Sequence, residues 1–526
     1  MLDVVVVGGG PAGSTAGNLL AEAGHEVLVL DKEDFPRFHI GESLLPCDLP
    51  IFDRLSMDMK SGPFLHKQGA EFIDEQSGDF AFYDFAHALP GGPTYAYQVE
   101  RASFDHALLL GAERAGAKVE LRTKVRDVAI DAAGATVTRD DGTTVRARFV
   151  VDATGQDAML GRRGRTIEPL KGLGRGAVFT HFTNLREDIW LGLTRLGNIK
   201  VLIRDDGWGW MIPLTGRRVS IGFVTHTRLL ELETLDEILS QSKVLQEITA
   251  GAERSQTRLA RNFSYKNTAP RGPRYACIGD ASCFLDPVFS SGVSLAMLGG
   301  EKLADLLSPA LLEEREAAPD VLAGLESHMQ GAYRSVGSLV YSFYNTGLVK
   351  NIFFAKSPEP ELRSGLISIL AGDVWRSDNK FQDMLLRSPS KSKSMTRSAT
   401  ASRRYSSSEC STNLPASAPV AWPMSATCWK IDGLTMLGVT VERVWISSTT
   451  APRLPQVCVT VTPLFVAPKT MYLPTWRLFS VKVTTAAVSG GAVPGVPRVT
   501  ASGLDSVNSV STCCSQLPLR LAQVVA

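Results

Sequence analysis

Residues 4–13 read VVVVGGGPAG, and this stretch decides the fold of the chain. Four consecutive valines are typical of a strand that is buried on both faces of a parallel sheet. The glycines that follow match the pattern G-x-G-x-x-G. In such a turn Gly8 permits the tight bend, Gly10 lets a pyrophosphate approach the backbone, and Gly13 allows a helix to pack closely on the strand. The stretch therefore predicts a dinucleotide-binding unit.

The residues after the turn complete this unit. Apolar residues recur at helical spacing over 16–23, and a second apolar strand at 26–30 leads into Asp31. Asp31 follows Gly8 by 23 residues, close to the ~20 that separate the glycine turn from an acid that binds ribose. A purely structural glycine-rich turn is the alternative, but it does not explain the strand, helix and acid in register. We expect the cofactor to be held by Gly8, Gly10, Ala12, Gly13 and Asp31.

Composition limits the class of protein. The 526 residues are 44% hydrophobic and 21% charged, which is typical of a globular chain of roughly three structural units. A net charge of +1 gives no case for a nucleic-acid or anionic-membrane partner. We find no apolar run near the ~18 residues of a membrane span and no signal-peptide pattern, and therefore expect a cytoplasmic protein. Eight cysteines without a C-x-x-C pair do not indicate a disulfide scaffold.

The near-neutral total hides an uneven distribution. Residues 388–526 contain 13 Lys+Arg but four Asp+Glu, together with five of the eight cysteines, whereas residues 1–387 carry a net charge of −8. The tail is rich in Ser, Thr, Val and Pro and lacks a sustained helical or strand period. It is interpreted either as a disordered or accessory segment or as sequence that was never selected to fold. We assign it no function.

Further segments resemble FAD-binding proteins. Residues 150–155 (VVDATG) look like the A-T-G segment of glutathione-reductase-type FAD domains. Residues 277–281 (CIGDA) resemble the G-D motif of flavoprotein hydroxylases, which implies that Asp280 contacts the ribityl chain; a helix cap is the alternative. Arg101 resembles the arginine that approaches the flavin, with a surface arginine as the alternative. No second G-x-G-x-x-G follows a strand, so we expect no separate nicotinamide domain.

Three other motifs together resemble flavin-dependent halogenases, over residues 1 to about 387. They are residues 38–46 (FHIGESLLP), 207–213 (GWGWMIP) and 285–293 (LDPVFSSGV). The W-x-W-x-I-P pattern is the most specific, and the resemblance implies that Trp208 and Trp210 keep the substrate from reaching the flavin. Packing of both side chains on one face of a strand is the alternative.

The resemblance also implies a reaction. FAD, reduced by a separate flavin reductase, reacts with dioxygen to a C4a-hydroperoxide, which converts chloride or bromide to hypohalous acid. Lys67 matches the family lysine that holds this oxidant, by hydrogen bonding or as a chloramine, near a small aromatic substrate; a solvated loop lysine is the alternative. The backbone of Ser291 and Gly292, at a helix N-terminus, would bind the halide, and Gly292 would also contact the flavin. A plain serine cap of the helix is the alternative. Ser43 would join the flavin and halide sites.

One position departs from the tryptophan-specific members of the family. These carry a Glu three residues before the Gly of the halide loop, where this chain has Phe289. The departure resembles the branch that acts on phenols, pyrroles or aromatic acyl groups tethered to a carrier protein. We therefore expect chlorination of such a substrate in secondary-metabolite biosynthesis. The eight histidines show no metal-ligand spacing, so we expect no metal.

The order of the motifs predicts an α/β architecture. We expect a glutathione-reductase-type FAD-binding Rossmann domain from residues 1–60, 98–165 and 266–306. An inserted, mostly antiparallel β-sheet substrate domain would comprise 61–97 and 166–265. A helical region would follow at 307–387.

Part of this set of motifs also occurs in proteins with other functions. A flavin-dependent aromatic monooxygenase and a geranylgeranyl-reductase-like oxidoreductase share the glycine turn, the G-D motif and sometimes a G-E-S-like loop. An inactive flavin-binding protein is the non-enzymatic alternative. Product mass separates the enzymes, because a hydroxylase adds oxygen, a reductase adds hydrogen and only a halogenase adds halogen.

Overall fold

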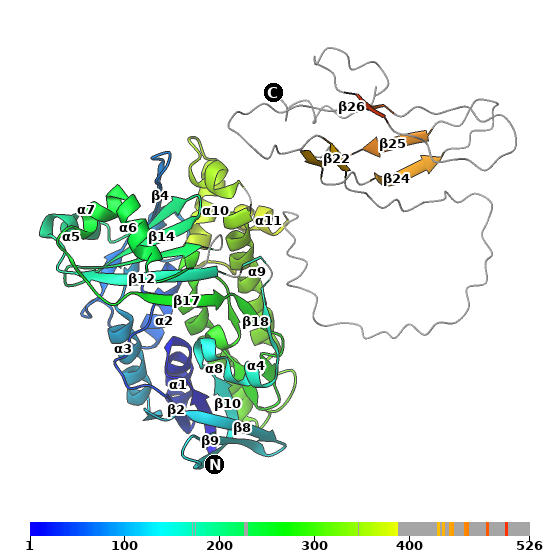
Figure 1. Cartoon of the computed structure of the whole chain (residues 1–526). Helices are drawn as coiled ribbons and strands as arrows, with labels where there is room; N and C mark the ends of the chain where they lie inside the picture. The colour runs from blue at the N-terminus through cyan, green and yellow to red at the C-terminus, as the bar shows by residue number, and fades with distance from the viewer. Residues whose placement is uncertain are drawn as a thin grey trace, which may run out of the picture. The chain divides into compact units, whose positions relative to one another are not determined.

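A computed structural model describes residues 1–387, apart from 171, 174, 226–229 and 346, and six short strands beyond them (Figure 1). The chain divides into two compact units, Met1–Ser402 and Arg403–Ala526. In the second unit the described strands form three antiparallel pairs: β22 (Trp429–Ile431) with β23 (Leu434–Met436), β24 (Val441–Ile446) with β25 (Val457–Val461), and β26 (Ser480–Lys482) with β27 (Thr500–Ser502). Most of 388–526 lies outside the described residues, so the interpretation of the tail stays a prediction.

The valine run forms the central strand of the first sheet. β1 (Leu2–Val7) pairs in parallel with β2 (Val27–Leu30) on one side and β10 (Thr144–Asp152) on the other. The last four residues of β1 are buried, as expected for a strand covered on both faces. The sheet has the order β19-β20-β10-β1-β2-β7, with a β8–β9 hairpin attached to β10. Its other strands are β7 (Lys118–Glu120), β8 (Val125–Asp131), β9 (Gly134–Arg139), β19 (Arg271–Gly272) and β20 (Tyr275–Cys277).

A second large sheet has the order β16-β12-β15-β14-β13-β4-β5, with β17 also paired to β12. All its pairs are antiparallel except β13 with β4. Figure 1 shows β12 and β14 far from β2, β8 and β10, which lie near the N-terminus. The α/β class expected from the sequence is confirmed, whereas the subdomain boundaries stay predictions. The strands are β4 (Gly69–Asp74), β5 (Phe80–Asp84), β12 (Arg175–Thr183), β13 (Ile199–Arg204), β14 (Gly207–Leu214), β15 (Arg218–Thr225), β16 (Glu253–Arg254) and β17 (Arg258–Phe263).

The first unit also contains two small, separate sheets. β3 (Leu65–Lys67) pairs with β6 (Ala96–Gln98), and β18 (Tyr265–Asn267) lies between β11 (Ile167–Pro169) and β21 (Cys283–Phe284). Short 3-10 turns precede two helices, η1 (Pro46–Asp48) before α2 (Leu49–Arg54) and η5 (Pro287–Phe289) before α8 (Ser291–Leu312). A third, η4 (Gly279–Ala281), follows β20.

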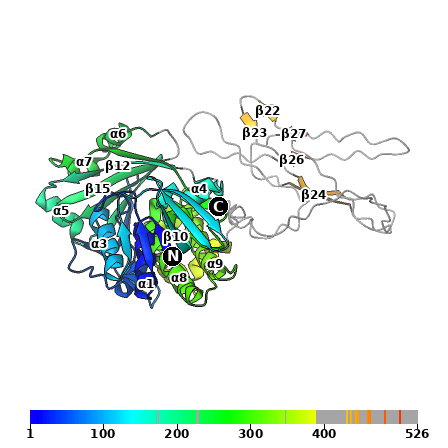
Figure 2. The ribbon, with the colours of Figure 1, turned by 90° about the horizontal axis from the view of Figure 1, so that it is seen from below.

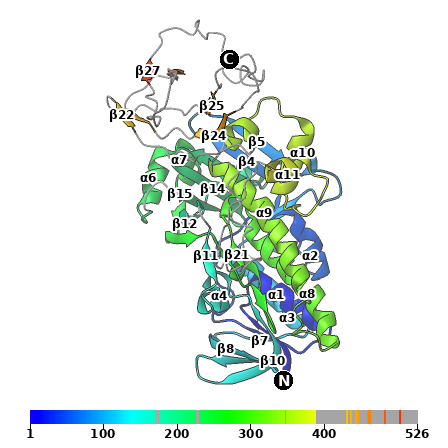
Figure 3. The same cartoon turned by 90° about the vertical axis from the view of Figure 1, so that its right-hand side faces the viewer.

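Helices α3 and α8 pack against α1. Figure 2 shows α1 between α3 and α8, and Figure 3 shows α8 and α9 side by side. No helix in the described part of the chain is long and apolar enough to cross a membrane. The helices are α1 (Pro11–Glu22), α2 (Leu49–Arg54), α3 (Arg101–Arg114), α4 (Met159–Arg163), α5 (Glu187–Thr194), α6 (Thr234–Gln241), α7 (Lys243–Thr249), α8 (Ser291–Leu312), α9 (Ala323–Asn345), α10 (Pro360–Leu370) and α11 (Lys380–Arg387).

Small residues let α1 and α8 approach closely. A Cβ atom added to Gly300 of α8 would lie 2.7 Å from the backbone oxygen of Ala12 and 3.2 Å from the backbone nitrogen of Ala16. A Cβ added to Gly279, whose φ is +59°, would lie 3.1 Å from Cβ of Ala12. The contact therefore holds the first turns of α1 against the middle of α8.

We expect Gly300→Ala to destabilise the protein by about 1–3 kcal/mol, because the added methyl group overpacks this contact. Gly331→Ala is the matched control: Gly331 lies in α9, and a Cβ there meets no atom within 4 Å. Because alanine has a higher helix propensity than glycine, Gly331→Ala should stabilise the protein by about 0.5–1 kcal/mol. Urea unfolding measures both effects, and equal midpoints for the two variants would contradict the proposed helix contact.

Candidate functional site

The glycine turn after β1 has the geometry that its sequence predicts. Gly8 has a φ of +109°, and a Cβ there would lie 2.2 Å from the backbone oxygen of Ala153. A Cβ at Gly13 would lie 1.8 Å from the backbone oxygen of Gly8. Beside Gly10, by contrast, the nearest atom to an added Cβ is Nη2 of Arg37, at 3.4 Å. Gly8 and Gly13 are thus required for packing, whereas Gly10 leaves room for a ligand at the start of α1.

The acid after β2 reaches back to this turn. One carboxylate oxygen of Asp31 accepts a hydrogen bond from the Gly9 amide at 2.7 Å, and the other accepts one from the Glu33 amide at 2.8 Å. Asp31 therefore orders the glycine turn. Its predicted contact with a ribose stays a prediction.

Arg101 is buried at the start of α3, with 4% of its surface exposed, so the alternative of a surface arginine is wrong. It donates to both carboxylate oxygens of Asp105, at 2.7 and 2.9 Å, and to the backbone oxygen of Ile40 at 2.6 Å. Its charge also acts on Asp280 in η4. Burial raises the pKa of Asp280 to about 7, while Arg101 and a hydrogen bond with Gln156 lower it. The structure thus brings these two predicted flavin-binding residues into one neighbourhood.

The loop that contains the G-E-S motif is fastened to strand β6. Ser43 forms an isolated antiparallel bridge with Gln98, and the Leu44 amide donates to the backbone oxygen of Tyr97 at 2.9 Å. Gly41 has a φ of +101°, which favours glycine at this bend. These contacts place Ser43 along β6, whose other partner is β3, the strand that ends at Lys67.

Lys67 is almost completely buried, with 1% of its surface exposed, so the alternative of a solvated loop lysine is wrong. Its ammonium group donates to Oγ of Ser43 and to the backbone oxygen of Leu44, both at 2.8 Å. Its Nζ also lies 5.2 Å from the centroid of the Phe85 ring. The nearby Lys60, in contrast, is exposed.

Asp48, in η1, is a buried acid near Lys67 that the sequence analysis missed. Its Oδ2 accepts hydrogen bonds from the Leu45 amide and from Oγ of Ser294, both at 3.0 Å. Burial lowers the pKa of Lys67 to about 7, and the charge of Asp48 opposes this shift. Burial also raises the pKa of Asp48 to about 6, against the hydrogen bonds and the charge of Lys67. A buried carboxylate among apolar neighbours gives no sequence signal that distinguishes it from a helix cap.

The predicted halide loop ends at the start of α8. Ser290 has a left-handed φ of +57° and its side chain makes no capping hydrogen bond, so the alternative of a plain serine cap at this position is wrong. Ser291 begins the helix and is buried. A Cβ added to Gly292 would meet no atom within 4 Å. The first turn of α8 thus combines backbone amides with open space at Gly292, an arrangement that suits an anion.

The two tryptophans of β14 are buried and lie on the same face, with ring centroids 5.9 Å apart. Trp208 Nε1 donates to the hydroxyl of Tyr344 at 2.7 Å, and this hydroxyl lies 3.1 Å from a carboxylate oxygen of Asp286. Trp210 Nε1 donates to Oγ of Ser220 at 3.2 Å. The core-packing alternative therefore describes both side chains correctly. Trp208 is in addition linked through Tyr344 of α9 to the halide loop, which sequence spacing could not reveal.

A second pair, of a half-buried histidine and a buried acid, was not predicted from the sequence. Nε2 of His181 lies 2.6 Å from Oε1 of Glu42, the acid of the G-E-S motif, and Phe38 packs edge-on against the His181 ring at 5.7 Å. Within the described residues, Oε2 of Glu42 has no hydrogen-bond partner. The motif itself was the available signal for Glu42, but its partner on β12 becomes visible only in the fold.

The predicted site residues thus fall into three groups. The glycine turn and Asp31 form one group. Gly279, the residue before Asp280, lies next to this group because it packs against Ala12. Ser43 and Lys67 form the second, which Asp48 and Ser294 connect to the first turn of α8. Trp208 and Trp210 form the third. In the described part of the chain no three His, Cys, Asp or Glu side chains could hold a metal ion together.

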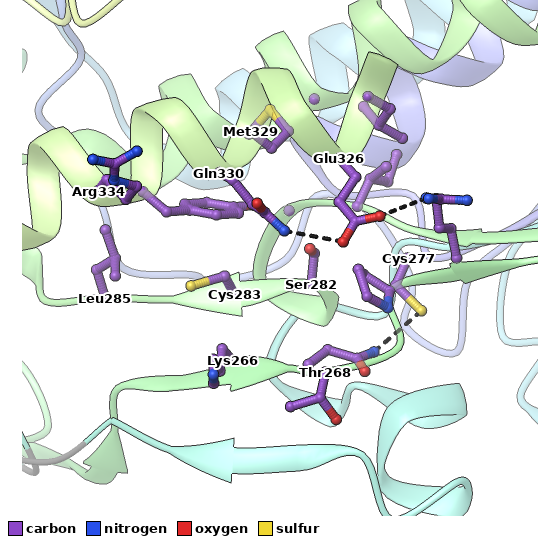
Figure 4. Close-up of a pocket in the computed structure, with 18 of the residues that line it drawn as sticks. Lys266, Thr268, Cys277, Ser282, Cys283, Leu285, Glu326, Met329, Gln330 and Arg334 are labelled. Atoms are coloured by element: carbon purple, nitrogen blue, oxygen red, sulfur yellow. Dashed lines mark hydrogen bonds and ion pairs between the residues drawn. The ribbon is translucent and has the colours of Figure 1, made fainter. Parts of the chain in front are cut away.

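A cavity of about 170 Å³ lies between α9 and strands β18, β20 and β21, and Gly279, the neighbour of Asp280, is among its lining residues (Figure 4). Leu285, Cys283 and Met329 line it, together with Glu326, which bonds to Arg271 at 2.7 Å. None of the predicted site residues lines this cavity.

Comparison with known proteins identifies similar sequences and folds. The family model described as tryptophan halogenase matches residues 3–92 and 89–356. The 1H-pyrrole-2-carbonyl-[peptidyl-carrier protein] chlorinase of Pseudomonas fluorescens is 29% identical over 406 residues, covering 71% of this chain and 89% of the relative. The corresponding brominase of Pseudoalteromonas luteoviolacea is 30% identical, with coverage of 73% and 96%. The solved structure of the flavin-dependent brominase Bmp2 is 27% identical, with a TM-score of 0.65 over 73% of this chain and 97% of the other.

The buried lysine predicts a pH-dependent stability. The pKa of Lys67 is about 7 in the folded protein but about 10.4 in an unfolded chain. Between these values the unfolded state binds more protons, so wild-type stability should rise with pH. Lys67→Met removes this titration, and the stability difference should therefore shift in favour of the wild type as pH rises from about 7 to about 10.

Urea unfolding over this pH range measures the shift, and the exposed Lys60 provides the control variant Lys60→Met, which should keep the wild-type profile. A difference between Lys67→Met and wild type that does not change with pH would contradict the lowered pKa.

Proposed function

The chain belongs to the tryptophan halogenase family of flavin-dependent halogenases, and we propose that within it this protein chlorinates an electron-rich aromatic ring, a phenol or a pyrrole. The observation that carries this proposal is Lys67, a buried lysine with a lowered pKa held by the G-E-S loop beside the helix of the halide loop. A hydroxylase or a reductase of the same fold class has no need for such a group. The family membership also argues against these alternatives.

The residues at the glycine turn fit FAD. A ligand can approach Gly10 without meeting a side chain closer than Arg37, and the positive end of the α1 dipole faces this space. Asp280 is a half-buried carboxyl group with a raised pKa, which suits a hydrogen bond to a ribityl hydroxyl. When bound and reduced, FAD supplies the dioxygen-dependent oxidation of halide to hypohalous acid. The residues proposed to hold it are Gly8, Gly10, Ala12, Gly13, Asp31, Ser43, Arg101, Asp280 and Gly292.

The halide is proposed to bind at the first turn of α8. The amides of Ser291 and Gly292 are at a helix N-terminus, where both unpaired N–H groups and the helix dipole favour an anion. No charged side chain is needed for this, so the site can hold chloride or bromide and release it to an oxidant. Chloride is favoured as the natural substrate, although the matched relatives include both a chlorinase and a brominase.

Lys67 is proposed to hold the hypohalous acid and direct it to the substrate. An ammonium group donates hydrogen bonds to a neutral oxidant, whereas the free amine can carry the halogen as a haloamine. With a pKa near 7 both forms of Lys67 are accessible at neutral pH. Trp208 and Trp210 are proposed to separate the substrate from the flavin, a role that their burial supports.

The substrate class follows from the position that is Glu in tryptophan-specific enzymes. Phe289 occupies it and packs edge-on against Phe343 at 5.6 Å, in an apolar cluster that offers no base. A phenol or pyrrole is activated by its own ring substituent or nitrogen and does not require that carboxylate. Since two relatives act on a pyrrole tethered to a carrier protein, a tethered substrate is proposed beside a free one. The reducing equivalents are proposed to come from a separate flavin reductase.

Product analysis tests the proposal. Purified protein is supplied with FAD, a flavin reductase and NADH, and with phenols and pyrroles offered both free and as carrier-protein thioesters. Each reaction is run with chloride, with bromide and without halide, and products are identified by mass. We expect halogenated product from the wild type and from the control Lys60→Ala. In Lys67→Ala, with FAD binding retained, we expect a loss of about 100-fold or more, as for removal of a positioned proton donor or acceptor.

Halide-independent gain of oxygen would contradict the proposal and identify a hydroxylase, and gain of hydrogen would identify a reductase. Equal halogenation by Lys67→Ala and Lys60→Ala would remove Lys67 from the mechanism.

A further inference from the structure

Lys67 and Asp48 bind opposite ends of one peptide unit. The ammonium group of Lys67 donates to the carbonyl oxygen of Leu44 at 2.8 Å. The amide of Leu45, which belongs to the same peptide unit, donates to Oδ2 of Asp48 at 3.0 Å. A cation, a peptide dipole and an anion are therefore aligned in one chain of hydrogen bonds. Such chains are cooperative, because each bond polarises the next.

The same carboxylate is tied to the helix of the halide loop. Oγ of Ser294 donates to Oδ2 of Asp48 at 3.0 Å. Ser294 lies in the first turn of α8, three residues after Ser291. Asp48, Ser294 and Lys67 have exposed fractions of 0%, 2% and 1%, so water does not screen this arrangement.

We propose that Asp48 is a positioning residue for the halogenation lysine, which acts through the Leu44–Leu45 peptide unit to orient the Lys67 ammonium group and to set its proton affinity. The inference deepens the proposed function and rests on it for the role of Lys67, whereas the contact between the two residues does not depend on turnover. It also connects Lys67 to the first turn of α8, so that the proposed halide and lysine sites keep a fixed separation.

The other titratable groups around the pair do not replace this role. Cys47 is the neighbour of Asp48, and its Sγ lies 3.8 Å from Oδ1 of Asp48. Burial raises the pKa of the Cys47 thiol well above its ordinary value, so it stays neutral in the pH range of Lys67. The negative charge of Asp373 contributes to this rise in the pKa of Cys47. The carboxylate of Asp48 is therefore the anion that favours the charged form of Lys67.

Direct titration of Lys67 tests the inference. The full chain is prepared with lysine carrying ¹³C at Cε, and the Lys67 resonance is identified by its loss in Lys67→Arg. Asp48→Asn keeps an oxygen that can accept from the Leu45 amide but removes the negative charge. We expect its Lys67 titration midpoint to fall by about one pH unit, and the pH profile of halogenation of the phenol and pyrrole panel to move by the same amount. The exposed Asp53, in α2, gives the matched control Asp53→Asn, with an unchanged midpoint.

Ser294→Ala provides a second variant that retains the carboxylate. Loss of the hydroxyl donor raises the pKa of Asp48, so the Lys67 midpoint should fall by less than in Asp48→Asn. This variant decides the question if Asp48→Asn does not fold. An unchanged Lys67 midpoint in the folded variants would overturn the inference. A lowered midpoint in a protein that makes no halogenated product would support the inference about Asp48 and contradict the proposed function instead.

Discussion

Desolvation of the Lys67 ammonium group is the constraint on which the arrangement of the site depends. A buried cation is costly unless its donors are paired and counter-charge is near. The fold supplies Ser43 and the Leu44 carbonyl from a loop that is fastened to β6, the strand paired with the one that carries Lys67. Asp48 then places negative charge behind the same loop. The pKa of Lys67, about 7, thus depends on strands β3 and β6, on the loop that contains the G-E-S motif, and on η1.

α1 and α8, whose N-termini form the proposed cofactor and halide sites, are in close contact with each other. α1 begins at the glycine turn and α8 begins at the proposed halide loop, and the first turns of α1 pack closely against the middle of α8 at Gly300. Helix N-termini favour anions, which suits a pyrophosphate at one and a halide at the other. Neither site then requires a charged side chain at the anion, and the charged residues Arg101, Asp280 and Lys67 remain for other contacts.

Local sequence signals predicted the parts of the site that form locally. The valine strand, Gly8 and Gly13 were predictable because a parallel strand and a tight turn impose residue types over ten positions. The W-x-W motif correctly indicated two side chains on one strand face. Burial of Arg101, the Trp208–Tyr344–Asp286 contact and the Asp48–Lys67 arrangement were not predictable, because each joins residues far apart in sequence whose types are also common at surfaces and caps. The interpretation of residues 388–526 still rests on their amino-acid composition.

The proposed reaction uses two separate places, a halide site in the backbone of α8 and Lys67, which receives the oxidant. A crystal structure of the protein with FAD and bromide, with anomalous scattering at the bromine edge, tests this most directly. We predict a bromide peak at the amides of Ser291 and Gly292, with Lys67 still hydrogen-bonded to Ser43 and to the Leu44 carbonyl. A bromide bound to the Lys67 ammonium group, with none at the start of α8, would contradict it.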